Sequence, residues 1–186
     1  MKRMAALVAC ALLAGCWQSK GSLYGDRASL QPFREGRVES RAAGRNANIG
    51  RARLTWRRDG YRLTNDDRRD SDFGDYFTLR FFALSGAPAG TLVFEATDPC
   101  KADDKKCTPQ TAPRYYGLAR ATRRGAAMFN PECAKNDPLG KRPGVTVEDY
   151  GICDFTERAE LEKALSALAA TDWKASVTYR FMDSAK

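Results

Sequence analysis

The chain combines six cysteines with no histidine, and this limits the chemistry that it can perform. Without an imidazole it has no Ser-His-Asp or Cys-His arrangement, and without a C-x-x-C pair it does not resemble a zinc site. Carboxylates are the remaining acid–base groups, for instance Glu148 or Asp149 with Asp154 or Glu95, which could act as the two acids of a sugar-cleaving enzyme do. Acids scatter in this way in most sequences, so we expect no catalysis, no metal and no cofactor.

The first sixteen residues contain a cysteine that directly follows an apolar run. Lys2 and Arg3 precede an unbroken apolar stretch from Met4 to Ala14, a layout typical of a secretory signal peptide and too short to span a bilayer. The stretch "LAGC", which ends at Cys16, resembles the lipobox of bacterial lipoproteins. The resemblance covers residues 1–16 only. It implies cleavage before Cys16 and acylation of that cysteine, which would anchor the protein to a membrane.

Cleavage at this point divides the chain into three parts. Residues 1–15 form the signal peptide, residues 16–22 form the lipidated cysteine with a short polar tether, and residues 23–186 form a single β-rich domain. We expect the mature protein in the cell envelope, anchored by lipid on Cys16 and held at the outer membrane, facing the periplasm. Inner membrane and outer membrane remain open alternatives at this point.

Four cysteines remain in the mature domain, and an even number in an oxidising compartment predicts disulfides. Three pairings can be drawn between them. We favour Cys100 with Cys107, which would close a short hydrophilic loop, and Cys133 with Cys153, which would close a longer loop and contribute about 3 kcal/mol.

Hydrophobic residues alternate with polar ones along most of the mature chain, which predicts β-strands. One stretch, Thr156–Ala170, instead has apolar residues at helical spacing, with Thr156 as its N-cap. Alternation also predicts that Tyr76, Arg80, Phe82 and Leu84, or some of them, lie on the less buried face of their strand. The fold class that we predict is mainly β, an antiparallel β-sandwich or small barrel with one late amphipathic α-helix. The predicted strands are 52–57, 60–64, 75–84, 90–97, 115–122, 125–130 and 173–181.

Positive charge is concentrated in one part of the chain. Residues 34–69 include eleven arginines and five acids, and Arg53, Arg57 and Arg62 fall at outward strand positions. Arginine suits phosphate because its planar fork donates two hydrogen bonds at once, so these residues are candidates for an anionic-ligand surface. The partners that we consider are anionic lipid, lipopolysaccharide or another envelope protein; nucleic acid is not expected. The alternative is that arginine is abundant here without any ligand.

These observations together favour a non-catalytic cell-envelope lipoprotein that acts as a binding or structural module. An inhibitor of periplasmic enzymes is the alternative, although a basic inhibitor would be repelled by basic targets such as lysozymes. A carboxylate-based hydrolase is the third class.

Overall fold

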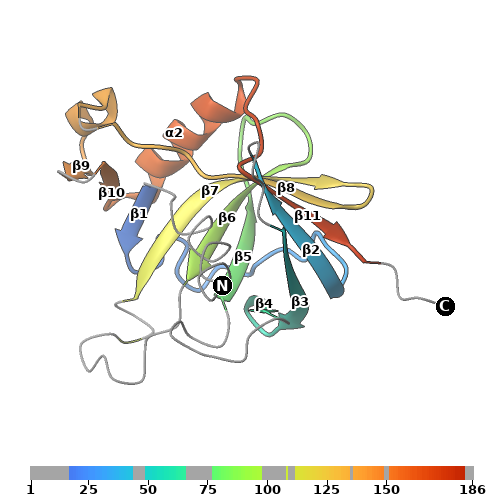
Figure 1. The fold of residues 1–186 in the computed structure, drawn as a ribbon. Coiled ribbons are helices and arrows are strands. Elements are labelled where there is room, and N and C mark those ends of the chain that lie inside the picture. Colours follow the sequence, from blue (N-terminus) through green and yellow to red (C-terminus); the bar gives the residue numbers. More distant parts are fainter. Residues whose placement is uncertain are drawn as a thin grey trace, which may run out of the picture.

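The computed structural model describes residues 17–43, 49–65, 77–97, 108, 112–134, 136–148 and 151–182. Within these residues the chain forms eleven strands, one 3-10 helix and one α-helix (Figure 1). The helices are η1 (Pro138–Lys141) and α2 (Arg158–Ala169). The strands are β1 (Trp17–Lys20), β2 (Gly36–Ala42), β3 (Ile49–Arg57), β4 (Gly60–Asn65), β5 (Phe77–Ala83), β6 (Thr91–Thr97), β7 (Pro113–Thr122), β8 (Gly125–Phe129), β9 (Val145–Glu148), β10 (Ile152–Phe155) and β11 (Val177–Phe181).

Eight of the strands in the described part of the chain form a closed antiparallel barrel. Their order is β6-β5-β4-β3-β2-β11-β8-β7, and pairing between β6 and β7 closes the ring. Closure removes the free edges that an open sheet would expose. Two glycines allow neighbouring strands to approach closely. A Cβ atom at Gly125 would overlap the carbonyl oxygen of Tyr179, and one at Gly117 would overlap that of Phe129.

The barrel interior is one hydrophobic core, built from the inward residues of the alternating strands. Large side chains fill it, among them Phe81 and Phe94, each 1% exposed. Phe33, which precedes β2, packs edge-on against Phe81 with ring centroids 5.0 Å apart. The interior is therefore filled by side chains rather than left as a channel.

A second core lies on the outside of the barrel, under α2. Strand β1 extends the sheet from β7 by antiparallel pairing, β10 continues it in parallel with β1, and β9 follows as an antiparallel strand. Leu161 and Leu165 of α2, both fully buried, pack in the same cluster as Phe82, Leu118 and Trp17. In Figure 1 this extension and α2 lie on one side of the barrel, and β2 and β11 lie on the other.

The predicted fold class is confirmed: the protein is mainly β, with a small barrel and a single α-helix late in the described chain. All three predicted hairpins form, as do the final strand and the helix. The helix begins at Arg158, two residues later than predicted. Thr156 is not its N-cap; its Oγ1 donates to the Gly144 carbonyl instead, at 3.3 Å, and Glu157 occupies the cap position without a side-chain hydrogen bond.

The structure differs from two local predictions. Within the tether predicted over residues 16–22, Trp17–Lys20 form strand β1, in which Trp17 is buried (3% exposed) and which pairs on both sides. Phe82 and Leu84 were predicted on the less buried face of their strand, and Tyr76, predicted with them, lies outside the described residues. Phe82 and Leu84 are both buried, because α2 and the segment after β1 cover the outside of β5, where Arg80 is also largely enclosed.

Candidate functional site

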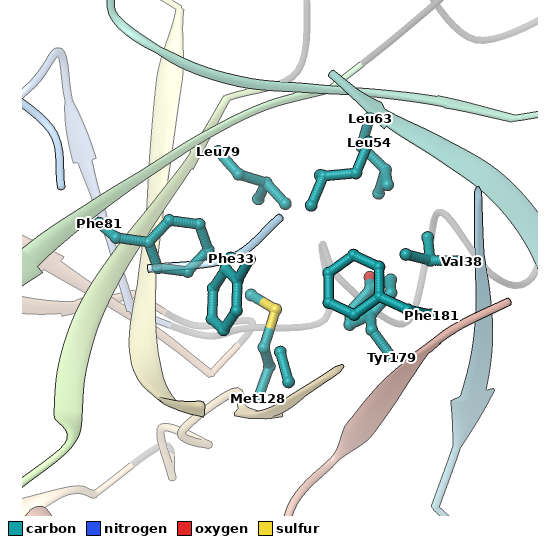
Figure 2. Close-up of a pocket in the computed structure, with 10 residues that line it drawn as sticks. Phe33, Val38, Leu54, Leu63, Leu79, Phe81, Met128, Tyr179 and Phe181 are labelled. Carbon is teal, nitrogen blue, oxygen red and sulfur yellow. The ribbon is translucent and has the colours of Figure 1, made fainter. Parts of the chain in front are cut away.

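A small apolar cavity lies in the barrel interior, as Figure 2 shows. Its walls are side chains of β2–β5, β8 and β11, together with Phe33. The free volume is about 20 Å³, close to the least space that a single water molecule needs. A water molecule also needs two or more polar partners, which these walls do not offer. The cavity is therefore a packing defect of the core in this structure and not a space for a ligand.

The Tyr179 hydroxyl lies in this apolar environment without a hydrogen-bond partner among the described residues. Burial raises the pKa of Tyr179 well above its ordinary value. Tyr61 is different, because its hydroxyl accepts from the Phe33 N–H at 3.0 Å and donates to the Phe33 carbonyl. Tyr61 thus fixes the segment before β2, whereas the Tyr179 hydroxyl is unsatisfied among the described residues.

A buried polar network fixes the chain that follows β1. Glu95, only 1% exposed, accepts hydrogen bonds from Ser22 Oγ at 2.6 Å, Tyr116 OH at 3.1 Å and Arg80 Nη1 at 3.1 Å. Arg80 Nη2 also donates to the Gly25 carbonyl at 3.0 Å. The network stabilises residues 22–25 against the barrel. It also closes Glu95 off from solvent, so Glu95 cannot serve as one member of an accessible catalytic carboxylate pair.

Two of the other candidate acids, Glu148 and Asp154, lie on the neighbouring strands β9 and β10. Asp154 is 8% exposed, and its Oδ1 has no hydrogen-bond partner among the described residues. Burial raises the pKa of Asp154, with Lys20 lowering it and Glu148 raising it to smaller extents. Asp149 lies outside the described residues.

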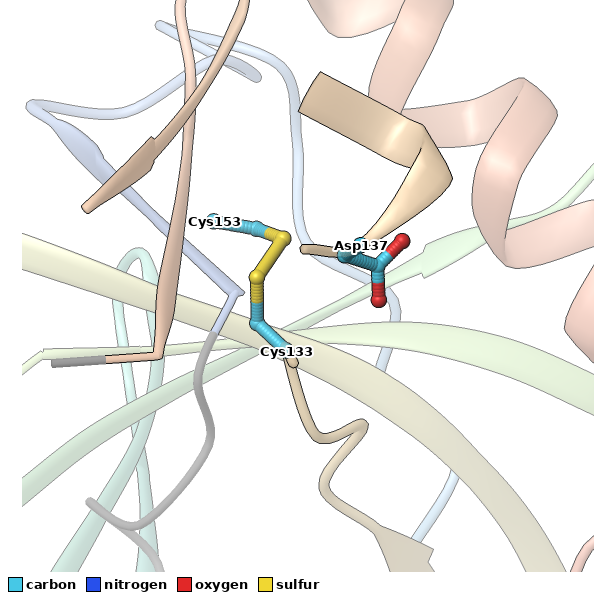
Figure 3. Close-up of side chains that lie close together, drawn as sticks. All are labelled: Cys133, Asp137 and Cys153. Carbon is cyan, nitrogen blue, oxygen red and sulfur yellow. A yellow bond between two sulfur atoms is a disulfide. The ribbon is translucent and has the colours of Figure 1, made fainter. Parts of the chain in front are cut away.

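The predicted disulfide between Cys133 and Cys153 is present, with a Cα–Cα distance of 5.7 Å. It joins β10 to the segment that follows β8. Asp137 lies beside it (Figure 3), and potential ligand atoms of these three residues lie within 4.8 Å of one another. Both thiols are consumed by the disulfide, and Asp137 accepts the Leu139 N–H at 2.9 Å to cap η1. This cluster is therefore structural. Cys16, Cys100 and Cys107 lie outside the described residues.

A groove of about 470 Å³ opens between α2 and η1. Its size falls within the range of about 300–1,000 Å³ that is typical of ligand sites. Most of its lining is apolar, but two buried donors in its walls, Trp17 Nε1 and Arg142 Nη1, have no hydrogen-bond partner among the described residues. We call this feature the α2 groove; its lining residues are Trp17, Phe129, Pro131, Glu132, Asp137, Leu139, Arg142, Ala164, Ala167, Leu168 and Thr171.

The predicted arginines lie together on the outer surface of the barrel. Arg53 and Arg57 are exposed and Arg62 is half-buried, all on outward positions of β3 and β4. Arg37, Arg41 and Arg51 of the same arginine-rich region, together with Arg180 of β11, extend this surface over β2, β3 and β11. Glu39 is the one described acid among them. We call this surface the arginine face; its members are Arg37, Arg41, Arg51, Arg53, Arg57, Arg62 and Arg180.

Register explains how the arginine face is assembled. Arg37 of β2 lies directly opposite Arg53 of β3, and Glu39 lies opposite Arg51 on one side and Arg180 on the other. The strand β2 was not predicted, although "GRVESRA" alternates charged residues with less polar ones. That alternation was the signal that could have added Arg37 and Arg41 to the candidate surface.

Comparisons with known proteins identified no relative of the chain. No family model matches the chain, and neither the curated proteins nor the solved structures include a significant match. Among the described residues, no helix has the length and apolar character needed to cross a membrane.

Proposed function

We propose that the protein is a non-catalytic, lipid-anchored binding module of the cell envelope. Its anchor is the acylated Cys16, its location is the periplasmic side of the outer membrane, and its arginine face binds a phosphate-bearing envelope ligand such as lipopolysaccharide or anionic lipid. The observation that carries the proposal is the arginine face, on which seven arginines share four neighbouring strands with one glutamate.

Charge placement supports a ligand for this face. Like charges directly opposite each other on neighbouring strands destabilise a sheet, and Arg37 faces Arg53 in this way. Glu39 lies at the middle of the face, and its contact with Arg41 is a loose one, with 4.0 Å between Nη2 and Oε1. An anionic ligand could accept paired hydrogen bonds from neighbouring guanidinium groups of this face.

The position of the face relative to the anchor supports a ligand that approaches from the side opposite the attachment point. Strand β1 begins one residue after Cys16 and pairs with β7. Three barrel strands separate β3 from β7 in either direction around the ring, so β3 lies opposite β7. A domain anchored next to β1 would thus present the arginine face away from its attachment point.

The anchor is tested by cell fractionation and mass spectrometry. A Cys16→Ser variant of the full chain should move from the membrane fraction to the soluble periplasm, because lipid on this residue is the proposed attachment. The mature native protein should begin at Cys16 and carry the added mass of acyl chains on that residue. An unmodified N-terminus at any other residue contradicts the proposal.

The arginine face is tested with a charge-matched pair of variants. Arg53→Glu with Arg57→Glu should abolish binding to lipopolysaccharide, whereas Lys141→Glu with Lys163→Glu should retain it. Each pair changes the net charge equally, but the lysines lie on η1 and α2, on the other side of the barrel. All four residues are exposed, so each substitution should alter stability by less than about 0.5 kcal/mol. Equal losses of binding in both variants would show a response to net charge alone.

A further inference from the structure

The α2 groove adjoins the point where the proposed anchor leaves the domain. Trp17 lines the groove, and it directly follows Cys16 in the chain. No linker separates them. A group attached to Cys16 therefore begins beside the groove.

Strand pairing fixes this position on two sides. Trp17 pairs with Cys153 of β10, and the next residue, Gln18, pairs with Tyr115 of β7. Cys153 is in turn joined by the disulfide to Cys133. Two residues just before Cys133, Pro131 and Glu132, belong to the groove wall, so β1 and that wall are tied together covalently.

The chemistry of the groove fits a hydrocarbon chain. Phe129, Leu139, Ala164 and Leu168 offer apolar surface from three separate segments. The two carboxylates in the lining, Glu132 and Asp137, together with the single guanidinium of Arg142, would disfavour a phosphate group. The buried donors without partners, on Trp17 and Arg142, suit the carbonyl oxygens of an ester or amide at the head of an acyl chain.

We infer that the α2 groove holds one acyl chain of the lipid on Cys16 of the same molecule. This inference rests on the proposed function, because it requires Cys16 to be acylated. Covalent attachment makes the chain an intramolecular ligand at high effective concentration. The remaining chains of the anchor enter the bilayer, and the domain is held against the membrane with β1 and α2 nearest the anchor.

Photo-cross-linking of the full-length, membrane-bound protein tests the inference. A benzophenone side chain is placed at position 167, where an exposed alanine lines the groove, and in a matched protein at position 170, where an exposed alanine does not. After irradiation, digestion and mass spectrometry should find the acylated Cys16 peptide joined through its acyl chain to the α2 peptide. The yield from position 167 should be at least ten-fold that from position 170.

Other occupants of the groove give different products. Mixing ¹⁵N-labelled and unlabelled protein distinguishes a cross-link within one chain from one between two copies. Three results would overturn the inference: a cross-link from position 167 to phospholipid, a cross-link to a second copy, or no cross-link at all. If the Cys16 peptide is acylated in the same sample, these results leave the proposed anchor intact. A Cys16 peptide without acyl mass would refute the proposed anchor, and the inference with it.

Discussion

Deleting the hydroxyl group of Tyr179 should stabilise the protein. This hydroxyl is buried in the apolar barrel interior and has no hydrogen-bond partner among the described residues. Leaving such a group unsatisfied costs about 1–3 kcal/mol, and Tyr179→Phe removes the cost while keeping the ring. Since the pKa of Tyr179 is raised by burial, the hydroxyl stays neutral near pH 7. We expect a gain of about 1 kcal/mol, which raises the melting temperature by about 2–4 °C for a chain of this size.

The same deletion elsewhere in the protein should have the opposite effect. Tyr61→Phe removes the hydroxyl that bonds both the Phe33 N–H and its carbonyl, and Tyr116→Phe removes one that bonds Glu95 and the Leu23 N–H. Each loss leaves buried polar groups unpaired, so each variant should lose about 2 kcal/mol.

Urea denaturation of the three variants and the native protein, with the disulfide oxidised, measures these differences. The slopes of the free energy of unfolding against urea should remain equal, so that midpoints report stability directly. A Tyr179→Phe variant that loses as much stability as Tyr61→Phe would refute the reasoning, because it would mean that the Tyr179 hydroxyl has a partner in solution.

Two further predictions concern the disulfide and a buried acid. Replacing Cys133 and Cys153 together by serine should lower the free energy of unfolding by about 3 kcal/mol, because the disulfide spans 20 residues; thermal unfolding with and without reductant checks this, and equal stability would contradict it. Burial raises the folded-state pKa of Asp154 above its ordinary value. The native protein therefore binds this proton more tightly than the unfolded chain does, and it loses stability as pH rises from about 4 through the folded pKa. The Asp154→Asn variant should accordingly be more stable than the native protein at pH 7, and the difference in stability should vanish near pH 3. Denaturation at a series of pH values measures this difference, and a difference independent of pH would refute the raised pKa of Asp154.

Local sequence patterns were enough to predict the hairpins and the helix. The β3–β4 turn at Asp59-Gly60 and the alternation on either side of it depend on neighbours in sequence, and so does the apolar stripe of α2. Patterns of this kind did not decide between sandwich and barrel, because closure depends on pairing of β6 with β7. The short strand β1 was missed since it is stabilised by β7 and β10, both distant in sequence.

The candidate sites divide in the same way. Arg53, Arg57 and Arg62 were predicted because strand alternation alone places them outward. Predicting the full arginine face would have required the register of β2 against β3 and of β11 against β2. Local sequence patterns do not determine this register. The α2 groove could not be predicted, because β1, η1, α2 and the segment after β8 meet only in the folded chain. The burial of Phe82 was missed for the same reason, since α2 covers the outer face of its strand.

The salt dependence of lipopolysaccharide binding tests the central claim most directly. Raising ionic strength from about 10 mM to about 150 mM shortens the screening length from about 30 Å to about 8 Å. If the arginine face binds phosphate groups, the affinity of the native protein should fall at least about ten-fold over this range, and the variant with Arg53→Glu and Arg57→Glu should show no binding even at low salt. Binding that keeps its strength at high salt, or that survives in this variant, would contradict an ionic contact through the arginine face.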